Sequence, residues 1–108
     1  MKILRRPCAP ATAHLEVAGE VDMETADQLA DAITDTVIHD HLTLVIVDFA
    51  KVTFCDSAGL AALDNAYALT RDQDIILHLI NVQPDVRRVL EITGMLQTLT
   101  QPNRHQAR

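Results

Sequence analysis

Aromatic residues are scarce in this sequence. Among its 108 residues there is no tryptophan, and the aromatic side chains are Phe49, Phe54 and Tyr67. Proteins that bind single-stranded DNA or RNA stack the bases on aromatic side chains. The chain therefore lacks the residues for an aromatic stacking platform.

Positive charge is also scarce away from the two ends. The formal net charge is −6, and five of the nine Lys and Arg residues lie in residues 1–6 and 104–108. Residues 7–103 hold 15 acidic residues against four basic ones, a balance of −11. From Glu16 to Asp40 there are eight acidic residues and no Lys or Arg. Such a body repels polyanions, so we expect no nucleic-acid partner.

Cysteine and long apolar runs are few as well. Cys8 and Cys55 do not suggest a disulfide scaffold. No apolar run approaches the ~20 residues of a membrane span. Arg5 and Arg6 are followed by a Pro-Cys-Ala-Pro stretch rather than by an apolar signal core. We therefore expect a cytoplasmic protein that does not insert into membranes.

Motifs for metal and nucleotide binding are missing. No two of the five histidines have the spacing of a helical metal site, and His39 and His41 read as a chance surface cluster. There is no G-x-x-x-x-G-K-[ST] phosphate loop. Neither a metal nor another cofactor is predicted.

The hydrophobic pattern alternates between strands and helices. Alternation at 14–17 predicts a half-buried strand, and the apolar runs 42–47 and 75–80 predict buried strands. We expect Asp48 to end the strand at 42–47 and a short extended segment to follow at 52–54. The remaining predicted elements are amphipathic helices at 25–39, from Ser57 to about residue 71, and from Pro84 to Gly94, and an edge strand at 96–99.

The order of these elements predicts an α/β sandwich with a mixed sheet. The length allows one domain, residues 1–108, with a core at about 13–99 and short basic ends. Thr25 and Gln28 have the spacing of a capping box for the first helix. On that helix Asp27, Asp31 and Asp35 form a stripe, which is either a solvated face or a means of steering a basic partner.

The turn Asp56-Ser57-Ala58-Gly59-Leu60 is the sharpest candidate site. Ser57 should lie at the start of a helix, where free backbone N–H groups would stabilise a phosphate. Ala58 and Gly59 leave room for a partner to approach, and Asp56 would repel a phosphoryl group, which adds about −1.5 to −2 charge. The alternative is that Ser57 is only a helix cap, contributing ~1 kcal/mol.

A second junction, Gly19-Glu20-Val21-Asp22, precedes the first helix. Glu20 and Asp22 are either loop residues whose charge suits the helix dipole or part of a contact surface beside the serine turn. Cys55 reads as a small apolar residue at the end of a strand. Its neighbour Asp56 argues against an activated thiol.

Three ordered motifs resemble STAS domains. Gly19-Glu20-Val21-Asp22 with Thr25-Ala26 resembles the family's opening, and Asp56-Ser57-Ala58-Gly59-Leu60 resembles its strand-turn-helix signature. Residues 82–95 resemble its third helix and the Thr-Gly ending. The likeness covers about residues 13–99 and implies a mixed, mostly parallel sheet covered by about three helices.

The resemblance implies an anti-sigma factor antagonist rather than an enzyme. Such a protein binds an anti-sigma factor with an ATPase-like kinase fold, frees the sigma factor, and is inactivated by phosphorylation of the serine that is here Ser57. A PP2C-type phosphatase restores it. The same resemblance places Asp22 and Asp56 on the polar surface around the phosphorylated serine. The full set of residues that we expect to contact the partner is Glu20, Asp22, Asp56, Ala58, Gly59, Leu60 and Asp64. Asp64, on the second helix, departs from the basic or glycine residues of many relatives and bears on which partner is bound.

Two other functions stay open at this stage. Some small STAS proteins are constitutive subunits of membrane lipid-transport ATPase complexes and use the same helix surface to hold the ATPase. The other is an enzyme or nucleotide-binding protein, for which the sequence offers no phosphate loop.

Overall fold

The fold is one four-stranded sheet with helices packed against it, seen in a computed structural model that describes residues 1–100. The basic residues at 104–108 lie outside the described part of the chain. In chain order the elements are β1 (Lys2–Arg6), β2 (Thr12–Val21), α1 (Ala26–His39), β3 (Leu44–Cys55), α2 (Ser57–Asp72), β4 (Ile76–Ile80), α3 (Pro84–Thr93) and α4 (Leu96–Thr100).

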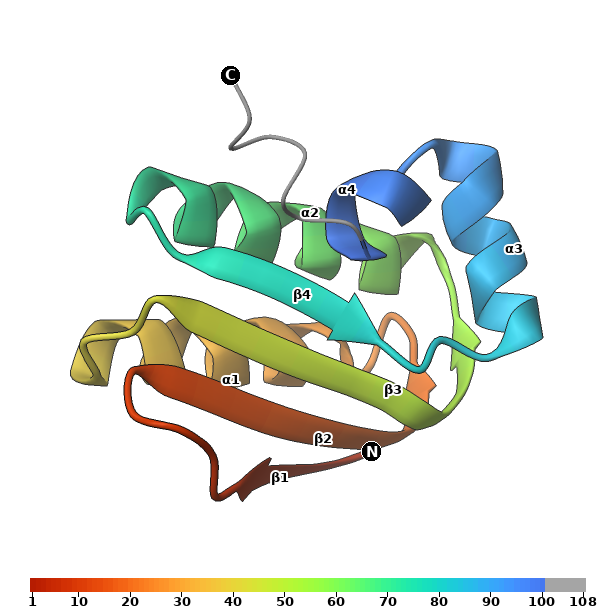
Figure 1. The fold of residues 1–108 in the computed structure, drawn as a ribbon. Helices are drawn as coiled ribbons and strands as arrows, with labels where there is room; N and C mark the ends of the chain where they lie inside the picture. Colours follow the sequence, from red (N-terminus) through yellow and green to blue (C-terminus); the bar gives the residue numbers. More distant parts are fainter. Residues whose placement is uncertain (101–108) are drawn as a thin grey trace.

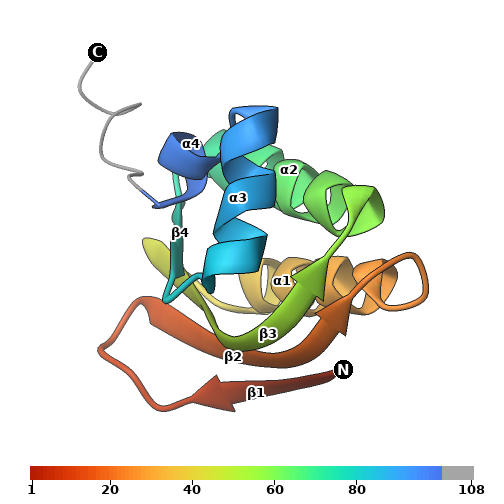
Figure 2. The same ribbon diagram turned by 90° about the vertical axis from the view of Figure 1, so that its right-hand side faces the viewer.

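The sheet has the strand order β1-β2-β3-β4. β1 runs antiparallel to β2, while β2, β3 and β4 are mutually parallel. Helices α1 and α2 lie side by side on one face of the sheet, as Figures 1 and 2 show together. The expected α/β architecture with a mixed, mostly parallel sheet is confirmed.

The core lies between the sheet and the helix pair α1–α2. Register places Ala13, Val45 and Leu77 in one row and Leu15, Val47 and Leu79 in the next, all at most 3% exposed. Leu29 and Ile33 of α1 and Leu63 of α2 belong to the same cluster. Burying each Val, Leu or Ile side chain of this set contributes roughly 1.5–3 kcal/mol. The strand and helix patterns predicted from the sequence thus place their apolar faces in the same layer.

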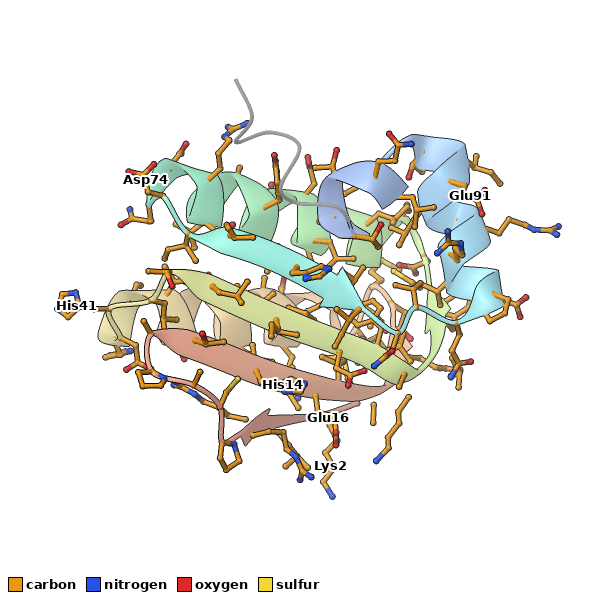
Figure 3. The ribbon with its side chains drawn as sticks, in the orientation of Figure 1. Lys2, His14, Glu16, His41, Asp74 and Glu91 are labelled. Atoms are coloured by element: carbon orange, nitrogen blue, oxygen red, sulfur yellow. The ribbon has the colours of Figure 1, made fainter. Side chains whose placement is uncertain are left out.

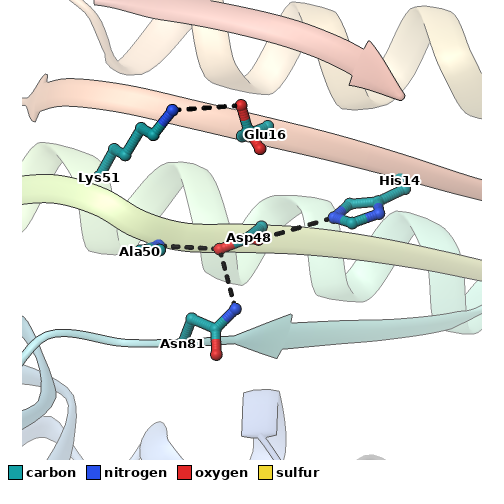
Figure 4. Close-up of polar contacts among 6 residues, drawn as sticks. All are labelled: His14, Glu16, Asp48, Ala50, Lys51 and Asn81. Carbon is teal, nitrogen blue, oxygen red and sulfur yellow. Dashed lines mark hydrogen bonds and ion pairs between the residues drawn. The ribbon is translucent and has the colours of Figure 1, made fainter. Parts of the chain in front are cut away.

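The opposite face of the sheet carries a polar cluster. Figure 3 shows Lys2, His14 and Glu16 there, turned away from α1 and α2. His14 lies 3.7 Å from Asp48, and Glu16 lies 3.7 Å from Lys51 (Figure 4). On β4 the buried Leu77 and Leu79 face the helix pair, and the half-buried Ile76, His78 and Ile80 lie on the opposite face.

Asp48 does not end its strand, which corrects the sequence-based expectation. β3 continues to Cys55 as one 12-residue strand with two irregularities in its pairing to β2. The carboxylate of Asp48 accepts from the N–H of Ala50 at 2.9 Å and from the amide of Asn81 at 3.3 Å. It therefore satisfies a backbone donor at an irregularity of the kind produced by a β-bulge.

The expected edge strand at 96–99 is also wrong. Leu96–Thr100 forms the short helix α4, whose buried Leu99 stands three residues after the half-buried Leu96. The hydroxyl of Thr100 donates to the carbonyl of Leu96, and its own carbonyl lies 3.1 Å from Nε2 of His78 on β4. α3 is as predicted, with Gly94 closing it in a left-handed conformation at φ 79°.

Candidate functional site: the serine turn and its neighbouring loop

The two candidate junctions meet at one edge of the sheet. Parallel strands β2 and β3 are paired so that Val21 stands opposite Cys55, which brings the turns that follow them to the same edge (Figures 1 and 2). The backbone N–H of Asp56 donates to the carbonyl of Val21 at 3.1 Å. The structure thus brings the Glu20–Asp22 segment and the Asp56–Ser57 turn together, although they are 34 residues apart in sequence.

Asp56, and not Ser57, caps α2. The Asp56 backbone is extended, and one carboxylate oxygen accepts from the N–H of Ala58 at 2.9 Å and of Gly59 at 3.1 Å. Ser57 is the first helical residue and is exposed. Its hydroxyl makes no hydrogen bond within residues 1–100. The interpretation of Ser57 as a helix cap is therefore wrong, because Asp56 is the N-cap residue of α2.

The same geometry corrects the expected phosphate contacts. The sequence suggested that free N–H groups at the start of α2 would hold a phosphoryl group on Ser57. Two of these donors, on Ala58 and Gly59, are already bonded to the Asp56 carboxylate. A phosphoryl group on Ser57 would therefore stand beside a carboxylate that occupies the helix terminus.

Gly59 lets α2 start close against the end of β2. A Cβ at this position would lie 2.8 Å from the carbonyl oxygen of Val21 and 2.7 Å from Sγ of Cys55. Gly59 is buried, and Leu60 is 8% exposed within the core cluster. Gly59 and Leu60 therefore support the turn from the interior of the protein, whereas Ala58 is half-buried at the surface.

One side of α2 continues the exposed surface from Ser57. Ala61 and Asp64 are exposed, four and seven residues further along. Because residues at i, i+4 and i+7 share a helix face, Asp64 lies on the side of α2 that carries Ser57, about 10 Å along the helix axis. A partner that contacts Ser57 along α2 therefore also meets Asp64.

The loop between β2 and α1 is held by a local hydrogen-bond network. Asp22 accepts at one carboxylate oxygen from the N–H groups of Glu24 (2.9 Å) and Thr25 (3.2 Å). The Thr25 hydroxyl donates to the carbonyl of Glu20 at 2.8 Å and accepts from the N–H of Asp22 at 2.9 Å. The predicted capping box with Gln28 is not formed, because the Thr25 side chain turns back toward β2. Glu20 is exposed, and Asp22 is half-buried.

Sequence reasoning missed two apolar residues at this edge. Met23 is 81% exposed in the loop after β2, and Phe54 is 48% exposed and stands opposite Glu20 in the strand register. The available signal was a methionine in the otherwise polar segment Asp22–Thr25. A bulged strand gives no such signal for Phe54, since its exposure depends on the irregular register.

Cys55 is buried directly beneath the turn. Burial, together with the charge of Asp56, raises the pKa of its thiol from 9.0 to about 11. This agrees with the expectation that the thiol is not activated. Within residues 1–100 no three His, Cys, Asp or Glu side chains come together to hold a metal ion. None of the helices in that range combines the length and hydropathy needed to cross a bilayer.

Comparisons with known proteins agree on one family. The STAS domain family matches residues 6–107. The anti-sigma-B factor antagonist of Listeria monocytogenes is 31% identical over 86 residues, which cover 78% of this chain and 75% of that protein. The crystal structure of an anti-sigma factor antagonist from Mycobacterium paratuberculosis is 28% identical, with a TM-score of 0.76, and the match covers 91% of this chain and 81% of that one.

Two further solved folds are similar at lower identity. The anti-sigma factor antagonist SpoIIAA in its unphosphorylated form has a TM-score of 0.73 at 22% identity, covering 88% of this chain and 83% of that one. A sulfate transporter family protein from Wolinella succinogenes has a TM-score of 0.76 at 21% identity, covering 89% and 77%. These two show the fold alone. From its motifs, its fold and its relatives, the chain belongs to the STAS domain family.

Proposed function

We propose that this protein is an anti-sigma factor antagonist that binds an anti-sigma factor, frees the sigma factor, and is switched off by phosphorylation of Ser57. It acts as a cytoplasmic binding protein and not as an enzyme. The anti-sigma factor would be its serine kinase, with an ATPase-like fold, and a PP2C-type phosphatase would reverse the modification.

The state of Ser57 is the observation that carries this proposal. Ser57 is exposed at the start of α2 and has no structural task, since Asp56 supplies the cap. It is also the one serine in the sequence. The relatives named anti-sigma-B factor antagonists support the partner class, and SpoIIAA is known in both an unphosphorylated and a phosphorylated form.

The charges around Ser57 suit an off switch. A phosphoryl group would add about −1.5 to −2 charge next to Asp56, with Glu20 and Asp22 across the Val21–Asp56 hydrogen bond. The added charge has little local compensation, because the Ala58 and Gly59 N–H groups are taken. The steric bulk of the phosphoryl group, and the cost of removing its poorly compensated charge from water, would then displace a partner surface fitted to the unmodified turn.

The test is an affinity capture from lysate of the source organism, followed by binding measurements with the purified partner. We expect the wild type and Ser57→Ala to capture an anti-sigma factor, and Ser57→Asp to lose it. Gln73→Glu adds the same charge at the far end of α2 and serves as the control that should still bind. With Mg-ATP, the captured factor should phosphorylate the wild type on Ser57 and leave Ser57→Ala unmodified.

Two results would contradict the proposal. Equal affinity of wild type and Ser57→Asp for the anti-sigma factor would remove the switch. Capture of a transporter ATPase by both proteins would instead favour a constitutive subunit of a membrane lipid-transport complex.

A further inference from the structure

Two exposed apolar side chains lie at the edge that carries Ser57, and the phosphorylation switch does not explain them. Met23 is 81% exposed and Phe54 is 48% exposed. Exposure of a large apolar side chain to water is unfavourable, and side chains of this kind often anchor protein interfaces. Their position at the candidate site makes them candidates for such anchors.

The loop that carries Met23 is preorganised. Its two ends are fixed by the Asp22 carboxylate, which accepts from the N–H groups of Glu24 and Thr25, and by the Thr25 hydroxyl, which donates to Glu20. The N–H groups of Thr25 and Ala26 also donate to the Asp22 carbonyl, at 3.1 and 2.8 Å. A side chain on a fixed loop loses less conformational entropy when it binds than one on a mobile loop.

Phe54 and Met23 are linked to Ser57 through the backbone. Phe54 stands opposite Glu20, and the next pair in the register is Val21 with Cys55. The Val21 carbonyl then receives the N–H of Asp56. In Figure 2 the loop after β2 and the start of α2 lie on the same side of the molecule. A partner that covers Ser57 and the loop after β2 therefore meets Met23. The same partner reaches Phe54 by extending around the end of β3, because Cys55 beside it is buried and neighbouring side chains of a strand point to opposite faces.

The charge around this edge defines the partner's chemistry. Glu20, Glu24 and Asp27 are exposed close to Met23 in the chain. No Lys or Arg occurs between Glu16 and Asp40. An apolar anchor beside acidic groups fits a surface that has an apolar pocket with a basic rim.

We infer that Met23 and Phe54 are the apolar anchors of the docking surface, and that the anti-sigma factor receives them in an apolar pocket bordered by Lys and Arg side chains. The inference rests on the proposed function and adds the residues and the surface chemistry through which the partner is recognised.

The experiment measures binding of the purified anti-sigma factor by calorimetry, with unphosphorylated protein. Met23→Ala and Phe54→Ala should each weaken binding about tenfold, as anchor residues do. Ile38→Ala is the matched control, because Ile38 is 67% exposed but lies in the last turn of α1, about 18 Å along the helix axis from Ala26. It should bind as the wild type does. Glu24→Gln should weaken binding and make the affinity depend less steeply on salt concentration.

The outcomes separate this inference from the proposed function. If Met23→Ala and Phe54→Ala bind like Ile38→Ala while Ser57→Asp does not bind, the anchors are wrong and the switch stands. If Met23→Ala weakens binding but Ser57→Asp does not, the docking surface stands and the switch is wrong. If the wild type binds no anti-sigma factor, both are overturned. Circular dichroism of each variant confirms that folding is not the cause.

Discussion

The backbone N–H of Asp56 donates to the carbonyl oxygen of Val21, with 3.1 Å between nitrogen and oxygen. This bond joins the end of β2 to the residue that caps α2. The loop with Glu20 and Asp22 extends from one partner, and Ser57 follows the other. The relative position of the two candidate segments therefore depends on a backbone contact, which substitution of an exposed side chain on either segment leaves in place.

Replacing Asp56 by alanine should destabilise the protein by about 1 kcal/mol, because the cap to the N–H groups of Ala58 and Gly59 is lost. Asp56→Asn keeps a capping oxygen and should lose much less. The free energy of unfolding from urea titration measures both. Asp64→Ala on the exposed side of α2 is the control and should stay within about 0.5 kcal/mol of the wild type. Equal losses for Asp56→Asn and Asp56→Ala would show that the cap is not what Asp56 contributes.

Gly59→Ala should destabilise the protein by about 1–3 kcal/mol, as expected for overpacking. The added Cβ would stand 2.8 Å from the Val21 carbonyl oxygen and 2.7 Å from Cys55 Sγ, so α2 must shift at its first turn. At an uncrowded helix position the same change would stabilise by about 1 kcal/mol. The sign of the change in the urea midpoint therefore decides whether α2 is packed as closely as the structure shows.

The sequence predicted the parts of the fold that depend on periodic burial. The apolar alternation in β2, the apolar run in β4 and the helical spacing of Leu29 and Ile33 follow from which side chains meet the core, and this is a property of the pattern itself. Pro84 and Gly94 marked the two ends of α3 because each residue has one strong backbone preference.

The errors concern polar residues with more than one available partner. Three polar side chains form short-range hydrogen bonds with the backbone. Asp48 does so at the bulge in β3, Thr25 in the turn after β2, and Asp56 as the cap of α2. Which of these forms depends on how the strand ends are placed, a tertiary property. The exposure of Phe54 likewise depends on the irregular register between β2 and β3, and so this part of the proposed docking surface could not be predicted from the sequence.

Thr25→Val should destabilise the protein by about 1–2 kcal/mol, because the isosteric change removes the hydroxyl that donates to Glu20 and accepts from Asp22. Thr25→Ser keeps the hydroxyl and should recover most of the loss. Gln28→Ala tests the capping box directly and should leave the free energy of unfolding within about 0.5 kcal/mol. A large effect of Gln28→Ala with none of Thr25→Val would mean that the box, and not the turn, holds this loop.

The thiol of Cys55 should make stability fall at high pH. Its pKa is raised from 9.0 to about 11 by burial and by Asp56, so the folded state keeps the proton over a range in which the unfolded state loses it. Its contribution is fully present below pH 9 and is lost as the pH rises toward 11. Urea titrations between pH 8 and pH 11 should show this decline, and Cys55→Ala should reduce it.

The burial of Cys55 can be tested by its reactivity. Cys8 is exposed, so in the Cys8→Ser variant at pH 8 the remaining thiol should react with a disulfide reagent only on unfolding. Rapid reaction of Cys55 in the folded variant would contradict its burial beneath the serine turn.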